Sequence, residues 1–392
     1  MKNFSFSNLK ILLLGSGELG KEFVIEAQRL GCQVIAVDKY ENAPAMQVAD
    51  NSFVIDMNNK DSLKKLIKEL LPDYVVPEIE SLSIEALKEL ELEGVRVVPN
   101  ARTVEMTMNR DKIRNLAFSD LNIRTAKYRY VYEYSSLRKN SLEIGFPLLL
   151  KPLMSSSGKG QTLVHKKEAL EDGWNEAMEH SRGKFKGVII EEYIDFKYEF
   201  TLLTVRTNEG RNIFCPPIGH EQHNGDYQCS WQPINMDISL LNEAKKITDK
   251  ILDNLDGSGL YGVEFFVNEE GLIFSELSPR PHDTGMVTIL SQNINEFELH
   301  LRAILGLPIP EINLISPAAT RVILSDDEFQ DFYFNGIDKA LEVQNSKILI
   351  FGKHLAKKGR RMAVALAAGK DIIEARFRAD ECASQINIKS LD

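Results

Sequence analysis

Cysteine, basic charge and long apolar runs are all scarce in this sequence, and each shortage excludes a class of protein. The four cysteines, Cys32, Cys215, Cys229 and Cys382, lie far apart, with no Cys/His cluster at metal-site spacing. We therefore expect reduced, buried thiols rather than disulfides or a structural zinc site. A net charge of −10 argues against nucleic acid as the main partner, because binding a polyanion needs a basic surface.

Apolar segments long enough for a membrane span or a signal peptide are missing as well. The N-terminal residues MKNFSFSNLK contain no apolar core, and no later window approaches the roughly 20 apolar residues that cross a bilayer. We expect a cytoplasmic protein that binds neither membranes nor nucleic acid, while one small phosphorylated ligand in a local basic pocket stays compatible with the acidic total. A chain of 392 residues is too long for one core, so two or three packed units are expected.

The N-terminal part alternates short apolar runs with helical periodicity, which is typical of buried parallel strands joined by crossover helices. The expected strands lie at 11–14, 34–37, 52–55, 74–77 and 95–98, and the expected helices at 19–30, 61–71 and 82–93. We interpret residues 1–120 as a Rossmann-like α/β domain. No repeat or low-complexity tract interrupts the chain.

The remaining sequence predicts two further units of α+β character. Residues 121–195 form the smaller one, with strands at 146–152, 162–164 and 187–194. Residues 196–392 form the larger one, with long antiparallel strands at 199–205 and 259–277 and a helix near 295–305. From about residue 310, short strands and a helix near 371–381 are expected to pack back on the core.

A glycine turn, Gly15-Ser16-Gly17-Glu18-Leu19-Gly20, follows the first strand and opens the first helix. Such a turn brings a ligand close to the backbone and to the positive end of the helix dipole. Asp38 ends the second strand, where a dinucleotide-binding fold places its ribose-binding acid, so an NAD enzyme is one interpretation. Glu18 argues against it, because a carboxylate in the turn would repel a pyrophosphate and suits a ligand with hydroxyl or amine donors.

A second glycine loop runs from Lys151 to Gln161 between two expected strands. Its small residues suit a flap whose amides and hydroxyls cover a triphosphate, with Lys151 and Lys159 as cations. The spacing is not that of a Walker A loop. A solvated Ser/Gly turn is the alternative when the loop is considered alone.

Two glutamates of one hairpin, Glu264 and Glu276, predict a metal site. A three-residue turn, Glu269-Glu270-Gly271, pairs Phe266 with Phe274 and sets the two acids opposite each other. Opposed carboxylates are destabilising unless a cation lies between them, and Mg²⁺ takes such ligands in ATP sites. A two-residue turn is the alternative, and it would place the acids on opposite faces.

Two further segments carry charge near this hairpin and near the C-terminus. The loop Ser278 to Gly285 directly follows the second acid strand, and its prolines fix a segment suited to ligand contact. Lys353, Arg360 and Arg361 form a cationic group that is either a solvated face or a phosphate site.

In combination these strings resemble the ATP-grasp superfamily, and most closely its formate-dependent phosphoribosylglycinamide formyltransferases. The resemblance covers nearly the whole chain. It is carried by GSGELGKE from Gly15, DKYENAPAMQVAD from Asp38, PEIE from Pro77, MNRD from Met108, KPLMSSSGKGQ from Lys151, GVEFFV from Gly262 and SELSPRPHDTGMVT from Ser275, with FGK and GRR near the C-terminus. It implies an ATP-grasp fold, and ATP-driven formylation through formyl phosphate in purine biosynthesis, with ATP and Mg²⁺ as cofactors.

The resemblance also implies roles for individual residues. ATP would be held by Arg110, Lys151, Ser156, Ser157, Gly158, Lys159, Gly160, Gln161, Glu191, Glu192, Tyr193, Ile194 and Glu199. Phosphoribosylglycinamide would be held by Glu18, Leu19, Glu78, Asp283, Lys353, Arg360 and Arg361. Mg²⁺ would be held by Glu264 and Glu276, while Lys151, Gly158 and Asp283 would serve catalysis. The adenine segment Glu-Glu-Tyr-Ile departs from the usual string of this family, but backbone contacts dominate there.

Formate and phosphoribosylglycinamide are then the expected small-molecule partners, and a homodimer is implied by the resemblance alone. The nearest alternative is the ATP-grasp carboxylase that makes N5-carboxyaminoimidazole ribonucleotide from bicarbonate. An NAD-dependent oxidoreductase would leave the glutamate pair and the second glycine loop without a role. A purely structural or binding role would leave every motif without one.

Overall fold

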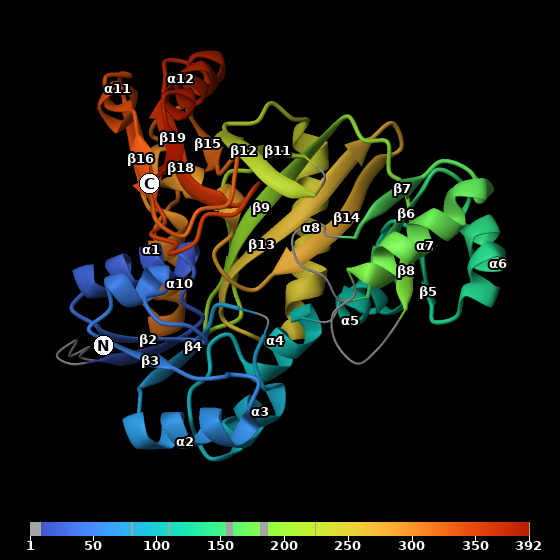
Figure 1. The fold of residues 1–392 in the computed structure, drawn as a ribbon. Helices are drawn as coiled ribbons and strands as arrows, with labels where there is room; N and C mark the ends of the chain where they lie inside the picture. The colour runs from blue at the N-terminus through green and yellow to red at the C-terminus, as the bar shows by residue number, and fades with distance from the viewer. Residues whose placement is uncertain are drawn as a thin grey trace.

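A computed structural model describes residues 9–79, 81–108, 110–153, 160–180, 187–223 and 225–391, with the side chains of 108–111 outside the description. Figure 1 shows an N-terminal α/β unit, a smaller unit built on an antiparallel sheet, and a large sheet that runs through the centre into the C-terminal part. The mixed α/β and α+β prediction is confirmed.

The N-terminal unit is built on a parallel sheet in the order β3-β2-β1-β4. Its strands are β1 (Lys10–Leu14), β2 (Gln33–Asp38), β3 (Asn51–Val54) and β4 (Tyr74–Pro77). Its helices are α1 (Glu18–Arg29), the short η1 (Pro44–Gln47), α2 (Lys60–Leu70) and α3 (Ile84–Leu92). Alternate side chains of β1, β2 and β4 enter opposite cores, so both faces are apolar and these strands read as continuous apolar runs, whereas the edge strand β3 is exposed.

The expected strand at 95–98 is wrong, because the segment makes only an isolated bridge between Val97 and Val75. Two backbone hydrogen bonds join it to β4, from the Val75 amide to the Arg96 carbonyl and from the Val98 amide to the Val75 carbonyl. Pro99 follows at once and has no N–H with which to continue the ladder.

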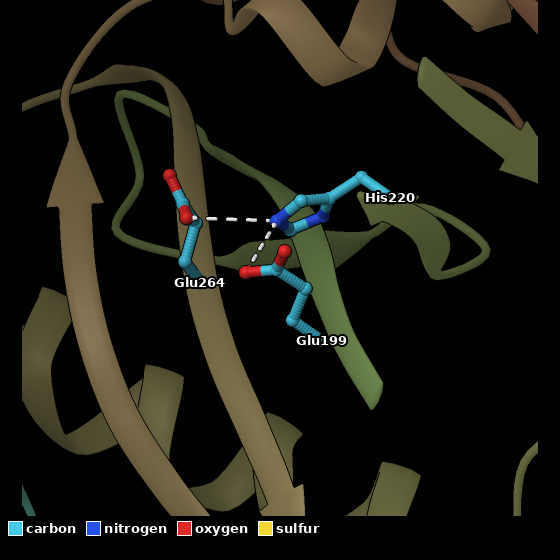
Figure 2. Close-up of side chains that lie close together, drawn as sticks. All are labelled: Glu199, His220 and Glu264. Atoms are coloured by element: carbon cyan, nitrogen blue, oxygen red, sulfur yellow. Dashed lines mark ion pairs between the residues drawn. The ribbon is translucent and has the colours of Figure 1, made fainter. Parts of the chain in front are cut away.

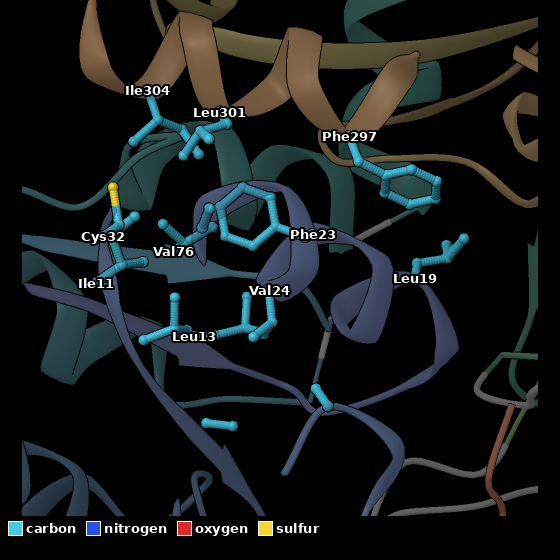
Figure 3. Packing of buried hydrophobic residues seen from close by; sticks show 14 of the residues in the cluster. Ile11, Leu13, Leu19, Phe23, Val24, Cys32, Val76, Phe297, Leu301 and Ile304 are labelled. Atoms are coloured by element: carbon cyan, nitrogen blue, oxygen red, sulfur yellow. The ribbon is translucent and has the colours of Figure 1, made fainter. Parts of the chain in front are cut away.

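One hydrophobic core joins the N-terminal unit to the C-terminal half. Phe23 of α1 and Leu13 of β1 pack in the same cluster as Leu301 of α10 (Glu296–Leu305) and Leu366 of β18 (Arg361–Ala368). Figure 3 shows the α10 side chains lying over α1 and the sheet. The glycine turn at the start of α1 is therefore held at a fixed place relative to segments more than 250 residues away in sequence.

The second unit is built on an antiparallel sheet in the order β5-β8-β6-β7. Three helical segments connect it to the first unit, namely α4 (Ala101–Met108), α5 (Arg110–Asn115) and η2 (Leu116–Asp120). Its strands are β5 (Tyr128–Val131), β6 (Leu148–Pro152), β7 (Thr162–Val164) and β8 (Val188–Glu192). Its helices are α6 (Tyr134–Ile144), η3 (Lys167–Ala169) and α7 (Leu170–Glu179), and α6 and α7 share the sheet's apolar core.

The large sheet has the order β14-β13-β9-β11-β12-β15-β18-β17, with β10 beside β9. Its strands are β9 (Tyr198–Arg206), β10 (Asn212–Phe214), β11 (Ile218–His223), β12 (Asp226–Gln232), β13 (Gly259–Asn268), β14 (Gly271–Ser278), β15 (Ala318–Leu324), β17 (Ser346–Ile350) and β18. The remaining elements are α8 (Ile238–Leu255), η4 (Asp283–Val287), α9 (Thr288–Ser291), α10, β16 (Phe332–Asn335), α11 (Ile337–Leu341), α12 (Ile372–Ser384) and β19 (Asn387–Ser390). The C-terminal segment packs on the core as expected, and it does so by extending the central sheet, because β12 pairs with β15.

The structure also bears on two expectations that came from the composition. All four cysteines are free and buried, which confirms the interpretation of isolated thiols. Within the described ranges, no helix combines the length and the apolar character that a membrane crossing requires.

Candidate functional site

The hairpin of β13 and β14 brings Glu264 and Glu276 together by a route that the sequence did not predict. The turn has two residues, because Asn268 pairs with Gly271, and Phe274 pairs with Phe265 rather than with Phe266. A bulge then inserts Ser275 as an extra residue on β14 and shifts the register by one. The pairing of Glu264 with Glu276 is therefore confirmed, whereas the three-residue turn is wrong.

Glu264 is held by side chains from three directions. The imidazole Nε2 of His282 lies 2.8 Å from Oε1, and the side-chain amide of Gln222 donates to Oε2 at 3.2 Å. The Nε2 of His220 lies 3.7 Å from Oε2 and 3.3 Å from a carboxylate oxygen of Glu199 (Figure 2). Protein donors thus relieve part of the repulsion that two opposed carboxylates would create.

These acids fit a divalent cation. Ligand atoms of Glu199, His220 and Glu264 lie within 4.8 Å of one another, and Glu276 faces Glu264 across the strand pair. Carboxylate oxygens on one sheet face, next to open coordination space for phosphate oxygens, are what Mg²⁺ accepts. The residues present could therefore hold this ion.

The sheet of the second unit carries a buried charge cluster. Glu191 of β8 and Lys151 of β6 form an ion pair, and Arg114 of α5 forms a second one with the same carboxylate. Arg114 also stacks over Tyr128, with the guanidinium carbon 5.5 Å from the ring centre. The sequence predicts roles for Lys151 and Glu191 but none for Arg114, which lies in no motif.

The structure describes some of the other residues expected to bind ATP and leaves others outside the description. Gly160 adopts a positive φ of 73°, and a Cβ there would lie 2.6 Å from His180, so the end of the glycine loop needs this residue. Tyr193 follows β8 with its side chain 40% exposed, while Glu192 accepts from the Lys127 amide at 3.1 Å. Gln161 and Ile194 flank these strands, and Glu199 lies on β9 beside His220. Five expected contacts lie outside the described residues or side chains, namely Arg110, Ser156, Ser157, Gly158 and Lys159.

The Asp38 side chain binds the backbone of the first glycine turn, and this contact argues against a dinucleotide site there. Asp38 accepts the amide of Ser16 at 2.8 Å with one oxygen and the amide of Lys39 at 2.7 Å with the other. Its carboxylate is 7% exposed, so it fixes the turn and is not presented to a ribose. Asp38 as a ribose-binding acid is therefore wrong.

Two ion pairs join the first glycine turn, the loop after β14 and the C-terminal unit. The Lys353 ammonium lies 2.7 Å from Glu18, and Arg361 lies 2.6 Å from Asp283. Lys353 also donates to the Arg361 carbonyl at 2.8 Å, which ties the two pairs together. Four of the expected substrate residues are thus brought into one cluster from three distant segments.

The other three expected substrate residues lie around this cluster. Glu78 follows β4, and its carboxylate oxygen lies 3.8 Å from the Cβ position of Gly17, so it borders the glycine turn. Leu19 is 5% exposed within the core, so only its backbone can face a ligand. Arg360 donates to the Leu355 carbonyl at 2.7 Å. A small cavity lined by Glu78, Pro279 and Arg280, among others, lies between the segment after β4 and the loop after β14.

Burial and pairing set the protonation of the cluster. Burial lowers the pKa of Lys353, and Glu18 only partly offsets this effect. Burial disfavours the charged forms of Arg361 and Asp283 too, but their attraction prevails, so the pKa of Arg361 rises and that of Asp283 falls below its usual range. A ligand with both an anionic and a cationic or hydroxyl group would complement this set.

Comparison with known proteins assigns each part of the chain. A ribonucleotide synthetase preATP-grasp domain matches residues 9–108, an ATP-grasp domain matches 116–297, and a PurT C-terminal domain matches 318–386. Among solved structures, carboxyaminoimidazole ribonucleotide synthase from Aspergillus clavatus, complexed with ATP, is 26% identical and covers 97% of this chain and 100% of its own, with a TM-score of 0.85.

Two nearer relatives are a formyltransferase and a transformylase by name. The formate-dependent phosphoribosylglycinamide formyltransferase of Prochlorococcus marinus subsp. pastoris is 67% identical over 390 residues, covering 100% of both chains. The solved glycinamide-RNase-transformylase T from Mycobacterium tuberculosis is 33% identical, with a TM-score of 0.80 over 96% of this chain and 100% of its own. On this identity and coverage, the chain belongs to the ATP-grasp family of formate-dependent phosphoribosylglycinamide formyltransferases.

Proposed function

We propose that this protein formylates 5′-phosphoribosylglycinamide with formate and ATP, giving formylglycinamide ribonucleotide, ADP and phosphate. The observation that carries the proposal is that the metal and nucleotide site lies next to the substrate cluster. Glu264, assigned to the metal and nucleotide side, contacts His282, and the next residue, Asp283, belongs to the cluster that includes Arg361, Lys353 and Glu18. Both substrates can therefore reach one point in space.

The chemistry requires two displacements. A formate oxygen attacks the γ-phosphorus of ATP, and the bond from that phosphorus to the β,γ-bridging oxygen breaks to release ADP. The glycinamide nitrogen then attacks the formyl carbon, the bond from that carbon to the phosphate oxygen breaks, and the nitrogen loses a proton. Such a reaction depends on positioning and charge neutralisation and needs no side-chain nucleophile.

On the nucleotide side, Lys151 supplies a cation that Glu191 holds in place from the neighbouring strand. Glu199 and the backbone after Glu191 are suited to the ribose hydroxyls and the adenine edge. Mg²⁺ held by Glu264 and Glu276 would neutralise charge on the phosphate oxygens. The segment Ser156 to Gln161 is proposed to cover the phosphates and exclude water, with Gly158 and Arg110 among the contacts.

On the substrate side, the cations and the acids are proposed to bind different groups of the ligand. Lys353, Arg360 and Arg361 are proposed to hold the phosphate by charge-assisted hydrogen bonds. Glu18, Glu78 and Asp283 offer acceptors for the ribose hydroxyls and the amine, with Leu19 contributing its backbone. The ion pairs between Lys353 and Glu18 and between Arg361 and Asp283 keep these four side chains oriented for ligand binding.

We further propose a three-part division at 1–120, 121–195 and 196–392, a homodimer, and a cytoplasmic location. The separate sheets of the first two parts support the division. The proposal of a dimer rests on family membership. The proposed location rests on the metabolic reaction, whose substrates are soluble.

The test is ADP release by the purified protein with paired substrates. Release that requires both formate and phosphoribosylglycinamide supports the proposal. Release that requires bicarbonate and aminoimidazole ribonucleotide supports the carboxylase alternative, which the lower identity of the carboxylase structure disfavours. Absence of ADP release with either pair contradicts both functions.

A further inference from the structure

A buried hydroxyl, that of Thr201, lies at the centre of the site without any assigned role. Thr201 is fully buried on β9, and it pairs across the sheet with Glu264 on β13. Two positions earlier on the same strand face is Glu199, which pairs with His220 on β11. Thr201 therefore lies among the two acids and the imidazole that Figure 2 shows converging.

Hydrogen bonds run through Thr201 from one histidine to the other. Nδ1 of His282 lies 2.9 Å from the Thr284 hydroxyl oxygen, and this hydroxyl donates to the Thr201 oxygen at 2.9 Å. The Thr201 oxygen lies 3.3 Å from Nδ1 of His220. Since the Thr201 oxygen already accepts a proton from Thr284, its own proton is available for His220.

This arrangement fixes where each imidazole lies. His282 contacts the Thr284 hydroxyl through Nδ1 and Glu264 through Nε2, 2.8 Å away. His220 contacts the Thr201 hydroxyl through Nδ1. Its Nε2 faces Glu199 at 3.3 Å, Glu264 at 3.7 Å and the side-chain amide of Gln222 at 3.4 Å.

We propose that Thr201 is a positioning residue that holds the His220 ring in place and, through it, the orientation of the Glu199 and Glu264 carboxylates. The inference rests on the proposed function, in which these acids hold the ribose and the metal. Without the Thr201 hydroxyl, the buried Nδ1 of His220 loses its hydrogen-bond partner, and the ring is no longer held with Nε2 facing the two carboxylates. The acids then lose the contact that keeps them in the geometry that binds Mg·nucleotide.

The test is calorimetric binding of Mg·AMP-PNP to the full chain with no other substrate. Thr201→Val removes the hydroxyl at nearly constant volume, and loss of such an outer partner is expected to weaken binding at least about tenfold. Thr201→Ser keeps the hydroxyl and is expected to bind within about twofold of the original, because the rescue depends on that group.

Thr204→Val is the matched control, because Thr204 is buried on the same strand and its hydroxyl donates only to the Leu202 carbonyl at 3.3 Å. It is expected to bind Mg·AMP-PNP as the original does, while showing the stability cost of losing a buried hydroxyl. Equal losses of melting temperature in the two valine variants, with loss of nucleotide binding in Thr201→Val alone, support positioning.

Two outcomes overturn the inference: Thr201→Val binding as tightly as the original, or Thr201→Ser binding as weakly as the valine variant. Should Thr201→Val fail to fold, Thr284→Val interrupts the same chain of hydrogen bonds, and unchanged binding there overturns it equally. Failure of the formylation assay with the original protein would remove the proposed function, yet the nucleotide-binding comparison would still decide the role of Thr201.

Discussion

At the scale of single residues, the site is a set of acids each held by a basic or hydrogen-bond donor group. Glu18 has Lys353, Asp283 has Arg361, and Glu264 has His282. The types and positions of the charged residues could be predicted from the sequence, because motif strings specify them. Their partners could not be predicted: Arg114 and His220 belong to no motif and reach the site only through packing of distant elements.

Glu276→Gln is expected to abolish Mg²⁺-dependent ADP release while the fold is retained. The amide keeps the shape of the side chain but removes the charge that opposes Glu264 across the strands. Turnover measured across a range of Mg²⁺ concentrations checks this, with circular dichroism as the control for folding. Unchanged activity at limiting Mg²⁺ would remove Glu276 from the metal site.

Lys353→Arg is expected to move the alkaline limb of the pH profile of kcat/KM for phosphoribosylglycinamide to higher pH. Burial lowers the pKa of Lys353, so its ammonium is lost as pH rises through a value below the usual lysine range. A guanidinium stays protonated throughout that window. A limb at the same pH in both proteins would show that Lys353 does not control it, whatever the absolute rate of the variant.

At the scale of elements, the parallel sheet was predictable because buried strands and crossover helices each leave a periodic signal. For the hairpin, the opposition of the two acids could be predicted, but not the turn that produces it. Its turn is one residue shorter than expected, and the extra residue Ser275 restores the opposition of the two acids. A bulge has no pattern of its own in a single sequence, which explains why the register of Phe265 and Phe266 was wrong.

The glycine turn gives a prediction at this scale, because the Asp38 side chain joins the amide of Ser16 in the turn to the amide of Lys39 after β2. Asp38→Asn keeps one acceptor and turns an NH₂ group toward the other buried amide. Leaving a buried donor unpaired costs about 1–3 kcal/mol, so the free energy of unfolding in denaturant should fall by that amount. Asp326→Asn, at an exposed position, is the control, and equal unfolding free energies in the two variants would contradict this role of Asp38.

At the scale of the whole molecule, the substrate cluster exists because a shared core fixes the N-terminal unit against the C-terminal half. Residues 18, 283, 353 and 361 come from three segments that only this packing brings together. The sequence predicted that the last stretch packs back on the core, but not that it continues the central sheet through β15 and β18. That pairing joins strands distant in sequence, and a single chain gives no signal for it.

A ligand that bridges these segments should stabilise the entire protein. Phosphoribosylglycinamide at a hundredfold excess over its Kd contributes about 2.7 kcal/mol, which is measurable as a rise in melting temperature. Arg361→Met is expected to lose most of this ligand-induced rise, because Asp283 loses its partner and the phosphate loses a cation. Lys358→Met, in the exposed part of the same loop, should keep it, and equal rises in both variants would contradict the assignment of Arg361.

The most direct test of the central claim follows oxygen from formate. If formate attacks the γ-phosphorus and the amine later displaces phosphate from the formyl carbon, one oxygen of each formate ends in inorganic phosphate. With ¹⁸O-labelled formate, ATP and phosphoribosylglycinamide, we predict one ¹⁸O atom in each phosphate released, detected by mass spectrometry. Phosphate without the label, formed together with the formylated product, would contradict the account.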